Sequence, residues 1–170
     1  MLVVYMLLDG VTRAIPIILL LYATLNVFLY RSCTWLLWTL LVSEGFNLIL
    51  KEVVFRAFLG KHKRLPLFGV GERPPGAHDC GPFSTYGMPS GHAQAVAVFS
   101  TFMILVAWNM RQPLLQKIVA SSFFVLCAAT VMYSRVAWAG CHTYGQVVLG
   151  ALIGCLVGTG SYTVRALTRS

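Results

Sequence analysis

Five long apolar runs constrain this chain more than any other feature. Each is 17 to 20 residues long, the length that an α-helix needs to cross the hydrocarbon core of a bilayer. The composition agrees, because 58% hydrophobic and 11% charged residues lie outside the range of soluble domains. We therefore predict an all-α integral membrane protein, residues 1–170 forming one bundle of about five transmembrane helices. The predicted spans are residues 14–30, 33–50, 93–110, 114–133 and 147–164.

The segments outside these runs differ in character. The leader MLVVYMLL is followed by Asp9, Gly10 and Arg13, and no Lys or Arg precedes it as in a secretory signal. It either lengthens the first span or lies in the membrane interface, and we predict the interface. Residues 60–89 form a long polar connection that holds five of the seven prolines. Loops of this length usually carry function.

Glycines recur every fourth residue in the last predicted span, at Gly150, Gly154 and Gly158. This spacing places them in one stripe along a helix, where small residues allow another helix to pack closely. We interpret the stripe as a packing surface.

Charge and cysteine content exclude several function classes. The net charge is +8, but the basic residues lie at span ends without a nucleic-acid recognition module. We expect them to meet lipid headgroups or phosphate, and we expect no nucleic acid partner. The five cysteines show no zinc spacing, so we expect no metal and no cofactor. Cys80 and Cys141 fall on the same membrane face, so a disulfide between them is geometrically conceivable.

Polar residues that are costly near a bilayer gather at span ends on one face. The second span ends near Lys51, the third begins after His92, and the fourth ends near Arg135. Alternating helix direction brings all of these ends to the same surface. The set combines three cations, a hydroxyl, the amides of a Ser-Gly turn and two imidazoles, which is a pattern typical of phosphoryl chemistry. Its members are Lys51, Arg73, Ser90, His92, Arg135, His142 and Gln146.

Three ordered motifs resemble the type 2 phosphatidic acid phosphatase superfamily. They are GERPP at residues 71–75, MPSGHAQ at residues 88–94 and SRVAWAGCH at residues 134–142. Three motifs in order between membrane spans are far more specific than any one of them. The resemblance covers roughly residues 45–155.

The resemblance implies a metal-independent phosphatase with assigned roles. His142 is similar to the nucleophile that forms a phosphohistidine, and His92 to the acid that protonates the leaving oxygen and later activates water. Lys51, Arg73 and Arg135 are expected to hold the phosphoryl oxygens. The Ser90–Gly91 turn is expected to add backbone amides at a helix N-terminus.

The chain departs from the family pattern in three places. Lys51 precedes Arg73 by 22 positions where the family lysine is close to its arginine, so the intervening stretch is a possible loop insertion, and Arg56, Lys61 or Lys63 could stand in for Lys51. Six residues rather than five separate Arg135 from His142, which a local bulge would absorb. Gln146 stands where the family usually has an aspartate that orients the nucleophile, and it is expected to accept the imidazole N–H.

The sequences YGMPSGHAQ and HTYGQVVLG are similar to the dolichyldiphosphatase branch, although Gly91 stands where a serine is expected. That branch implies removal of the terminal phosphate of dolichyl diphosphate in the endoplasmic reticulum, which recycles the lipid carrier of protein N-glycosylation. Two further functions stay open: a broader lipid phosphatase acting on phosphatidate or similar lipids, and a catalytically weak membrane protein that binds lipid phosphates.

The sequence leaves orientation and assembly open. Without the three proposed phosphate ligands, five Lys and Arg residues lie on each membrane side. The positive-inside rule therefore does not indicate which side is cytoplasmic. A lumenal active site rests on the resemblance alone. A homodimer is possible, since a partner copy or the leader would supply a span missing from the family's usual six-helix core.

Overall fold

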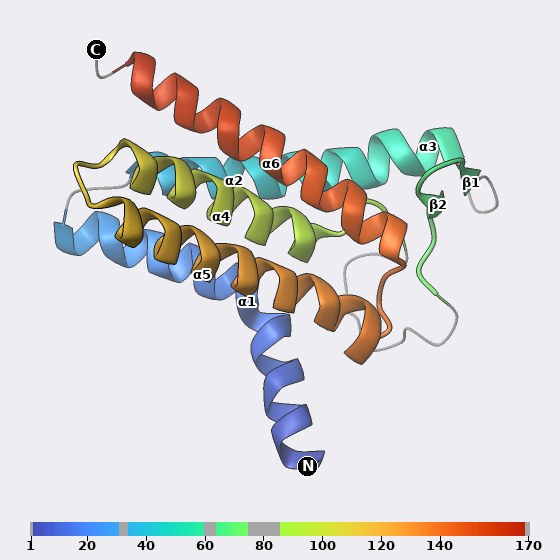
Figure 1. The fold of residues 1–170 in the computed structure, drawn as a ribbon. Helices are drawn as coiled ribbons and strands as arrows, with labels where there is room; N and C mark the ends of the chain where they lie inside the picture. The colour runs from blue at the N-terminus through green and yellow to red at the C-terminus, as the bar shows by residue number, and fades with distance from the viewer. Residues whose placement is uncertain (1, 31–33, 60–63, 75–85, 169–170) are drawn as a thin grey trace.

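The computed structural model describes residues 2–30, 34–59, 64–74 and 86–168. Five long helices form the fold, and Figure 1 shows the C-terminal part of α1 lying along the bundle that α2, α4, α5 and α6 form. The prediction of an all-α membrane helical fold is confirmed. The long helices are α1 (Leu2–Tyr30), α2 (Thr34–Ile49), α4 (Gly91–Asn109), α5 (Leu114–Tyr133) and α6 (Tyr144–Leu167).

Among the described residues, three helical segments are long and apolar enough to cross a membrane: Gly91–Asn109, Leu114–Trp138 and Tyr144–Leu167. They match the last three predicted spans. The first two predicted spans are also helical: the first lies within α1, which has 29 residues, and the second corresponds to α2, which has 16 residues. A π-helical segment, η1 (Leu50–Phe55), and the short α3 (Arg56–Leu59) lengthen α2 at the end that carries Lys51.

The leader is helical and continuous with α1. Figure 1 shows the N-terminal part of α1 turned away from the bundle. Pro16 lies inside this helix. Proline has no N–H for the carbonyl four residues earlier, so it kinks a helix. The proline therefore accounts for the change of direction that separates the leader from the bundle.

Helix α4 lies at the centre and packs most closely on α6. A Cβ atom added at Gly150 would lie 2.5 Å from the backbone oxygen of Ser90, and one at Gly154 would lie 2.5 Å from that of Gln94. These contacts leave room only for glycine. The interpretation of the glycine stripe as a packing surface is confirmed.

A buried polar network joins α4 to α2. The side-chain amide of Gln94 donates to the backbone oxygen and the hydroxyl of Ser43, both at 2.9 Å, and it accepts from Asn47 at 2.8 Å. All three side chains are almost fully buried. Since buried polar groups need partners, the network fixes the register of the two helices.

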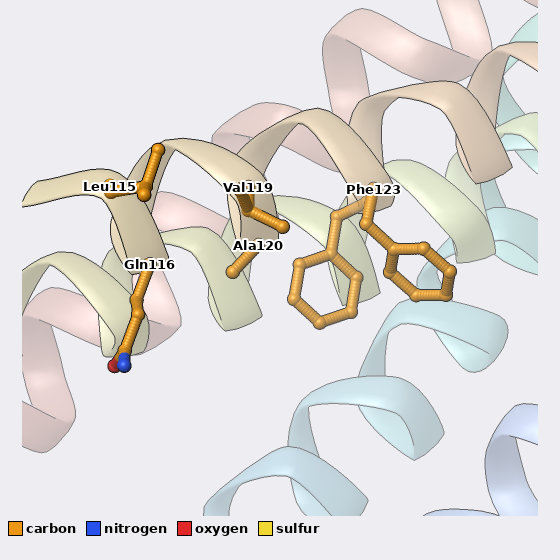
Figure 2. Close-up of a pocket in the computed structure, with 6 residues that line it drawn as sticks. Leu115, Gln116, Val119, Ala120 and Phe123 are labelled. Atoms are coloured by element: carbon orange, nitrogen blue, oxygen red, sulfur yellow. The ribbon is translucent and has the colours of Figure 1, made fainter.

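Helix α5 is the least covered of the three spans. Its side chains at Leu115, Val119 and Phe123 are more than half exposed and follow one another along the helix (Figure 2). In a membrane protein, a face of this kind lies in the hydrocarbon core of the bilayer.

The stretch between Lys51 and Arg73 is the predicted insertion, and its described part is ordered. After η1 and α3, a two-stranded antiparallel hairpin pairs β1 (Arg64–Leu65) with β2 (Gly69–Val70). The hairpin returns the chain to the bundle end, where the backbones of Glu72 and Tyr86 form an isolated antiparallel β-bridge.

Candidate active site

The site lies at the bundle end where α4 and α6 begin and α5 ends. The buried residues there are Lys51, Ser90, Arg135, His142 and Gln146, while Arg73 and His92 are partly buried. The charges of Lys51, Arg73 and Arg135 act on both His92 and His142. The structure therefore brings together the side chains that the sequence placed on one face.

His142 is held in one tautomer. Its Nδ1 lies 3.1 Å from Oε1 of Gln146. Because an amide oxygen only accepts hydrogen bonds, Nδ1 carries the proton and Nε2 keeps its lone pair. Burial, with the nearby positive charge of Lys51, lowers the pKa of His142 to about 3, and the Gln146 hydrogen bond opposes this shift. At neutral pH the imidazole is uncharged and able to act as a nucleophile.

Gln146 also holds the segment that carries Arg73. Its Nε2 donates to the backbone oxygens of Val70 at 2.9 Å and Glu72 at 2.6 Å. These contacts fix which end of the amide is oxygen, so Oε1 must face His142. Sequence reasoning predicted only the contact with His142; it missed the two donor contacts.

The Pro-Ser-Gly turn presents a buried hydroxyl. The backbone N–H of Ser90 donates to the backbone oxygen of Gln146 at 3.0 Å. Its Oγ is fully buried and has no hydrogen-bond partner within the described part of the chain. Gly91 begins α4, whose first N–H groups have no partner inside the helix. A hydroxyl and a helix N-terminus together form a ready site for an anion.

Arg135 and His142 are connected by the backbone. The chain from Ser134 to Trp138 is π-helical (η2), and the N–H groups of Cys141 and His142 both bond to the backbone oxygen of Arg135. A π-helical turn accommodates one extra residue. This turn is the predicted local bulge, and it absorbs the longer spacing.

His92 contacts a residue that the motifs did not include. Its Nε2 lies 3.0 Å from the backbone oxygen of Arg13 on α1. A carbonyl only accepts, so Nε2 carries the proton in this contact. The partner is a backbone oxygen, and the only sequence signal near it is Pro16, which disturbs the hydrogen bonding of this part of α1.

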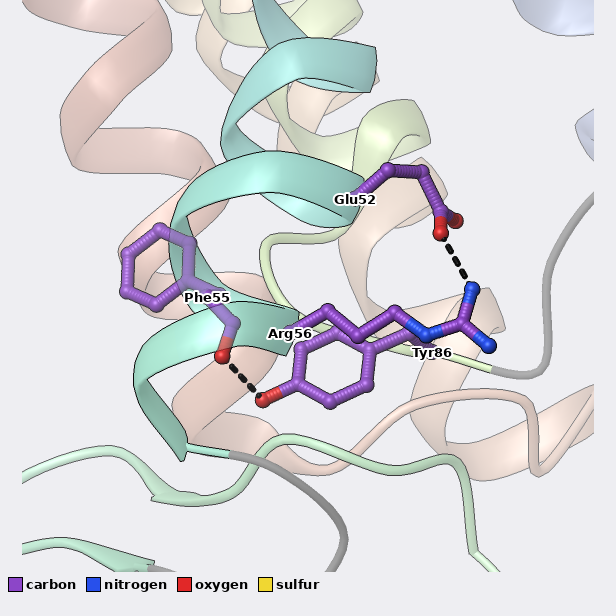
Figure 3. Close-up of polar contacts among 4 residues, drawn as sticks. All are labelled: Glu52, Phe55, Arg56 and Tyr86. Carbon is purple, nitrogen blue, oxygen red and sulfur yellow. Dashed lines mark hydrogen bonds and ion pairs between the residues drawn. The ribbon is translucent and has the colours of Figure 1, made fainter.

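Lys51 rather than Arg56 lies beside the histidines. Figure 3 shows Arg56 paired with Glu52 at 2.6 Å, and its side chain is 60% exposed. In the same figure, the hydroxyl of Tyr86 donates to the backbone oxygen of Phe55 at 2.9 Å. This bond ties the end of η1 to the turn before Ser90. Lys61 and Lys63, which the sequence also allowed in place of Lys51, lie outside the described residues.

One cysteine, Cys141, lies next to His142 in the site. Cys141 is fully buried and disulfide-bonded, whereas Cys127 and Cys155 are free. The predicted partner, Cys80, lies outside the described residues. Among the residues that the structure describes, no group of three or more His, Cys, Asp or Glu is placed to hold a metal ion.

A family model described as the PAP2 superfamily matches residues 32–169. The chain belongs to the PAP2 superfamily. This is a family of phosphatases, and with the three apolar spans it makes the chain a membrane protein of that family. A search of curated proteins found no match, and a search of solved structures found none either. The match begins after α1, so Arg13 and its contact with His92 lie outside the part that defines the family.

Proposed function

We propose that the protein is a metal-independent phosphatase that hydrolyses a polyisoprenyl diphosphate, of the dolichyl type, to the monophosphate and phosphate. The observation that carries the proposal is the state of His142. Its Nδ1–H is bound to Gln146 and its Nε2 keeps its lone pair, in a site with three cations and with a Ser90 hydroxyl that has no partner among the described residues. An uncharged imidazole with a fixed tautomer suits attack on phosphorus.

In the proposed reaction, Nε2 of His142 attacks the terminal phosphorus and the bond to the leaving lipid phosphate breaks. The leaving oxygen takes a proton from Nδ1 of His92, which enters the reaction as an imidazolium with its Nε2–H on the Arg13 carbonyl, a state that the negative charge of the bound substrate favours. Water then attacks the phosphohistidine, gives its proton to His92 and releases phosphate. Lys51, Arg73 and Arg135 balance the negative charge of the transferring group.

The proposed substrate and location rest on particular features. YGMPSGHAQ and HTYGQVVLG resemble the dolichyldiphosphatase branch, and the disulfide of Cys141 supports an active-site face in an oxidising compartment. We therefore propose the endoplasmic reticulum membrane with the site facing the lumen, and a role in lipid carrier recycling.

The test is phosphate release by the purified protein in detergent with a chelator present, comparing dolichyl diphosphate, dolichyl monophosphate and phosphatidate. We expect release from the diphosphate, loss of release in His142→Ala, and an acid-labile phosphoenzyme in the wild type. Preference for phosphatidate would contradict the substrate, and release that survives in His142→Ala would contradict the nucleophile.

The role of His92 is tested by leaving-group dependence. We expect His92→Ala to slow phosphohistidine formation from a lipid diphosphate much more than from p-nitrophenyl phosphate, since nitrophenolate leaves without a proton. Equal slowing with both substrates would contradict a role as general acid.

A further inference from the structure

Apolar side chains follow one stripe of α5 away from the site. Leu115, Val119, Phe123, Cys127 and Val131 recur every fourth residue, and Arg135 follows at the same spacing. Two adjoining cavities lie along this stripe and share Phe123 and Phe124. The upper cavity, of about 190 Å³, lies between α1, α4 and α5, whereas the lower one, of about 500 Å³, is an open groove lined by side chains of α5 alone (Figure 2).

The upper cavity begins directly beneath the candidate active site. Val96 lines it one helical turn after His92, and Val131 lines it one turn before Arg135. From α1, Ile15 lines it two residues after Arg13, whose carbonyl binds His92. A substrate whose phosphate lies between His92 and Arg135 would therefore direct its hydrocarbon chain into this cavity.

The lining suits hydrocarbon and little else. Phe99 and Phe124 form an edge-on pair at 5.8 Å, and Phe123 and Phe124 another at 5.5 Å, so three aromatic rings form one wall. The hydroxyl of Ser100 is already bonded to the backbone oxygen of Phe124 at 3.2 Å. A ligand that needs a hydrogen-bond donor would therefore gain none from it.

The length of the stripe distinguishes between chain classes. From Val131 to Leu115 the helix rises about 24 Å. One leaflet of a bilayer provides about 15 Å of hydrocarbon, half of the 30 Å core. A chain confined to one leaflet would leave the lower cavity without a ligand, whereas a long isoprenoid would continue past the midplane.

We propose that this stripe, with its two cavities, binds the chain of a long polyisoprenyl phosphate substrate. The proposal rests on the proposed function and adds to it the place of the chain and a preference for chains longer than one leaflet. The specificity-determining residues are Cys127 in the upper cavity and Val119 in the lower one.

The test uses two matched free cysteines in membrane spans. Cys127 lines the upper cavity, whereas Cys155 on α6 lines neither cavity. We expect Cys127→Phe to lower kcat/KM about tenfold or more for both farnesyl diphosphate and a long polyisoprenyl diphosphate, since displacing two methylenes already corresponds to roughly that factor. Cys155→Phe should change neither, and p-nitrophenyl phosphate should be cleaved equally by all three proteins.

The Val119→Trp variant tests the preference for long substrate chains. Val119 lies about 24 Å along the helix from Arg135, beyond the reach of a farnesyl chain. We expect it to lower kcat/KM for the long substrate alone. Equal losses with the soluble ester, or losses matched by Cys155→Phe, would overturn the proposal. So would conversion of a dimer to a monomer by Cys127→Phe, which would make the stripe an interface between copies.

A binding measurement needs no turnover. A polyisoprenyl phosphate carrying a diazirine on its chain is photo-crosslinked to the wild-type protein, and the labelled peptides are mapped. Labels on the Leu114–Tyr133 helix support the proposal, while labels mainly on α2 or α6 overturn it. If the wild type releases no phosphate from any lipid but the labels fall on α5, the proposed function fails and the chain site stands.

Discussion

Replacing Gln146 with Glu tests how the protein sets the state of His142. The wild-type Oε1 lies 3.1 Å from Nδ1, so Glu would put a negative charge where a neutral acceptor stands. An opposite charge this close raises the pKa of a histidine by about 1–3 units. The pKa of His142 would then rise from about 3 to roughly 4–6. Since only the uncharged imidazole attacks phosphorus, activity would be lost as the pH falls through this raised pKa.

The same substitution removes the donors to Val70 and Glu72. A carboxylate facing two carbonyls leaves both unpaired, at about 1–3 kcal/mol each, so we also expect a loss of activity that is independent of pH. Gln146→Met is the matched control, because it loses the same donors without adding charge.

The assay is phosphate release between pH 3.5 and 8, expressed as the ratio of variant to wild type. The ratio cancels the ionisation of the substrate, which all three proteins share. For Gln146→Glu we expect the ratio to decline below about pH 6 or 5, by up to tenfold per unit, whereas for Gln146→Met it should stay flat. A flat ratio for Gln146→Glu would refute the proposed state of His142.

Three further predictions follow from single contacts. Ser90→Ala should lower kcat/KM about 10- to 100-fold without lowering the melting temperature, because its hydroxyl has no partner in the described fold and is available to phosphate; a fall in stability would contradict this. Pro16→Ala should straighten α1 and weaken the bond from His92 to the Arg13 carbonyl, lowering kcat about fivefold, and unchanged kcat would show that this bond is dispensable. Gly154→Val should cost about 1–3 kcal/mol or more in thermal unfolding because its Cβ would lie 2.5 Å from the Gln94 oxygen, whereas Gly160→Val, with open space around it, should cost much less.

The helices and the grouping of the site residues could be predicted from the sequence. Apolar length defines spans, and alternating helix direction brings Lys51, His92, Arg135 and His142 to one end. Both are consequences of the bilayer and of chain connectivity, so they need no side-chain detail. The glycine stripe was predictable for the same reason, because its four-residue spacing reports one helix face.

Contacts made by backbone atoms could not be predicted in this way. The Arg13 carbonyl that binds His92 has no residue type of its own, and any residue at that position would supply the same oxygen. For the π-helical turn that begins at Ser134, the sequence showed only that one extra residue separates Arg135 from His142 and predicted a local bulge without its form. The extension of α2 through η1 and α3 was hidden because the charged residues there lie beyond the apolar run.

Two of the departures from the family pattern have one physical explanation. The segment between Lys51 and Arg73 returns through β2, which places the carbonyls of Val70 and Glu72 against the first turn of α6. An aspartate in place of Gln146 would meet these carbonyls with acceptors only and would leave them unpaired in a buried position. Glutamine satisfies them with its N–H groups and still accepts from His142. Glutamine is therefore the side chain that suits this segment. In exchange, His142 lacks the negative charge that an aspartate would place beside it.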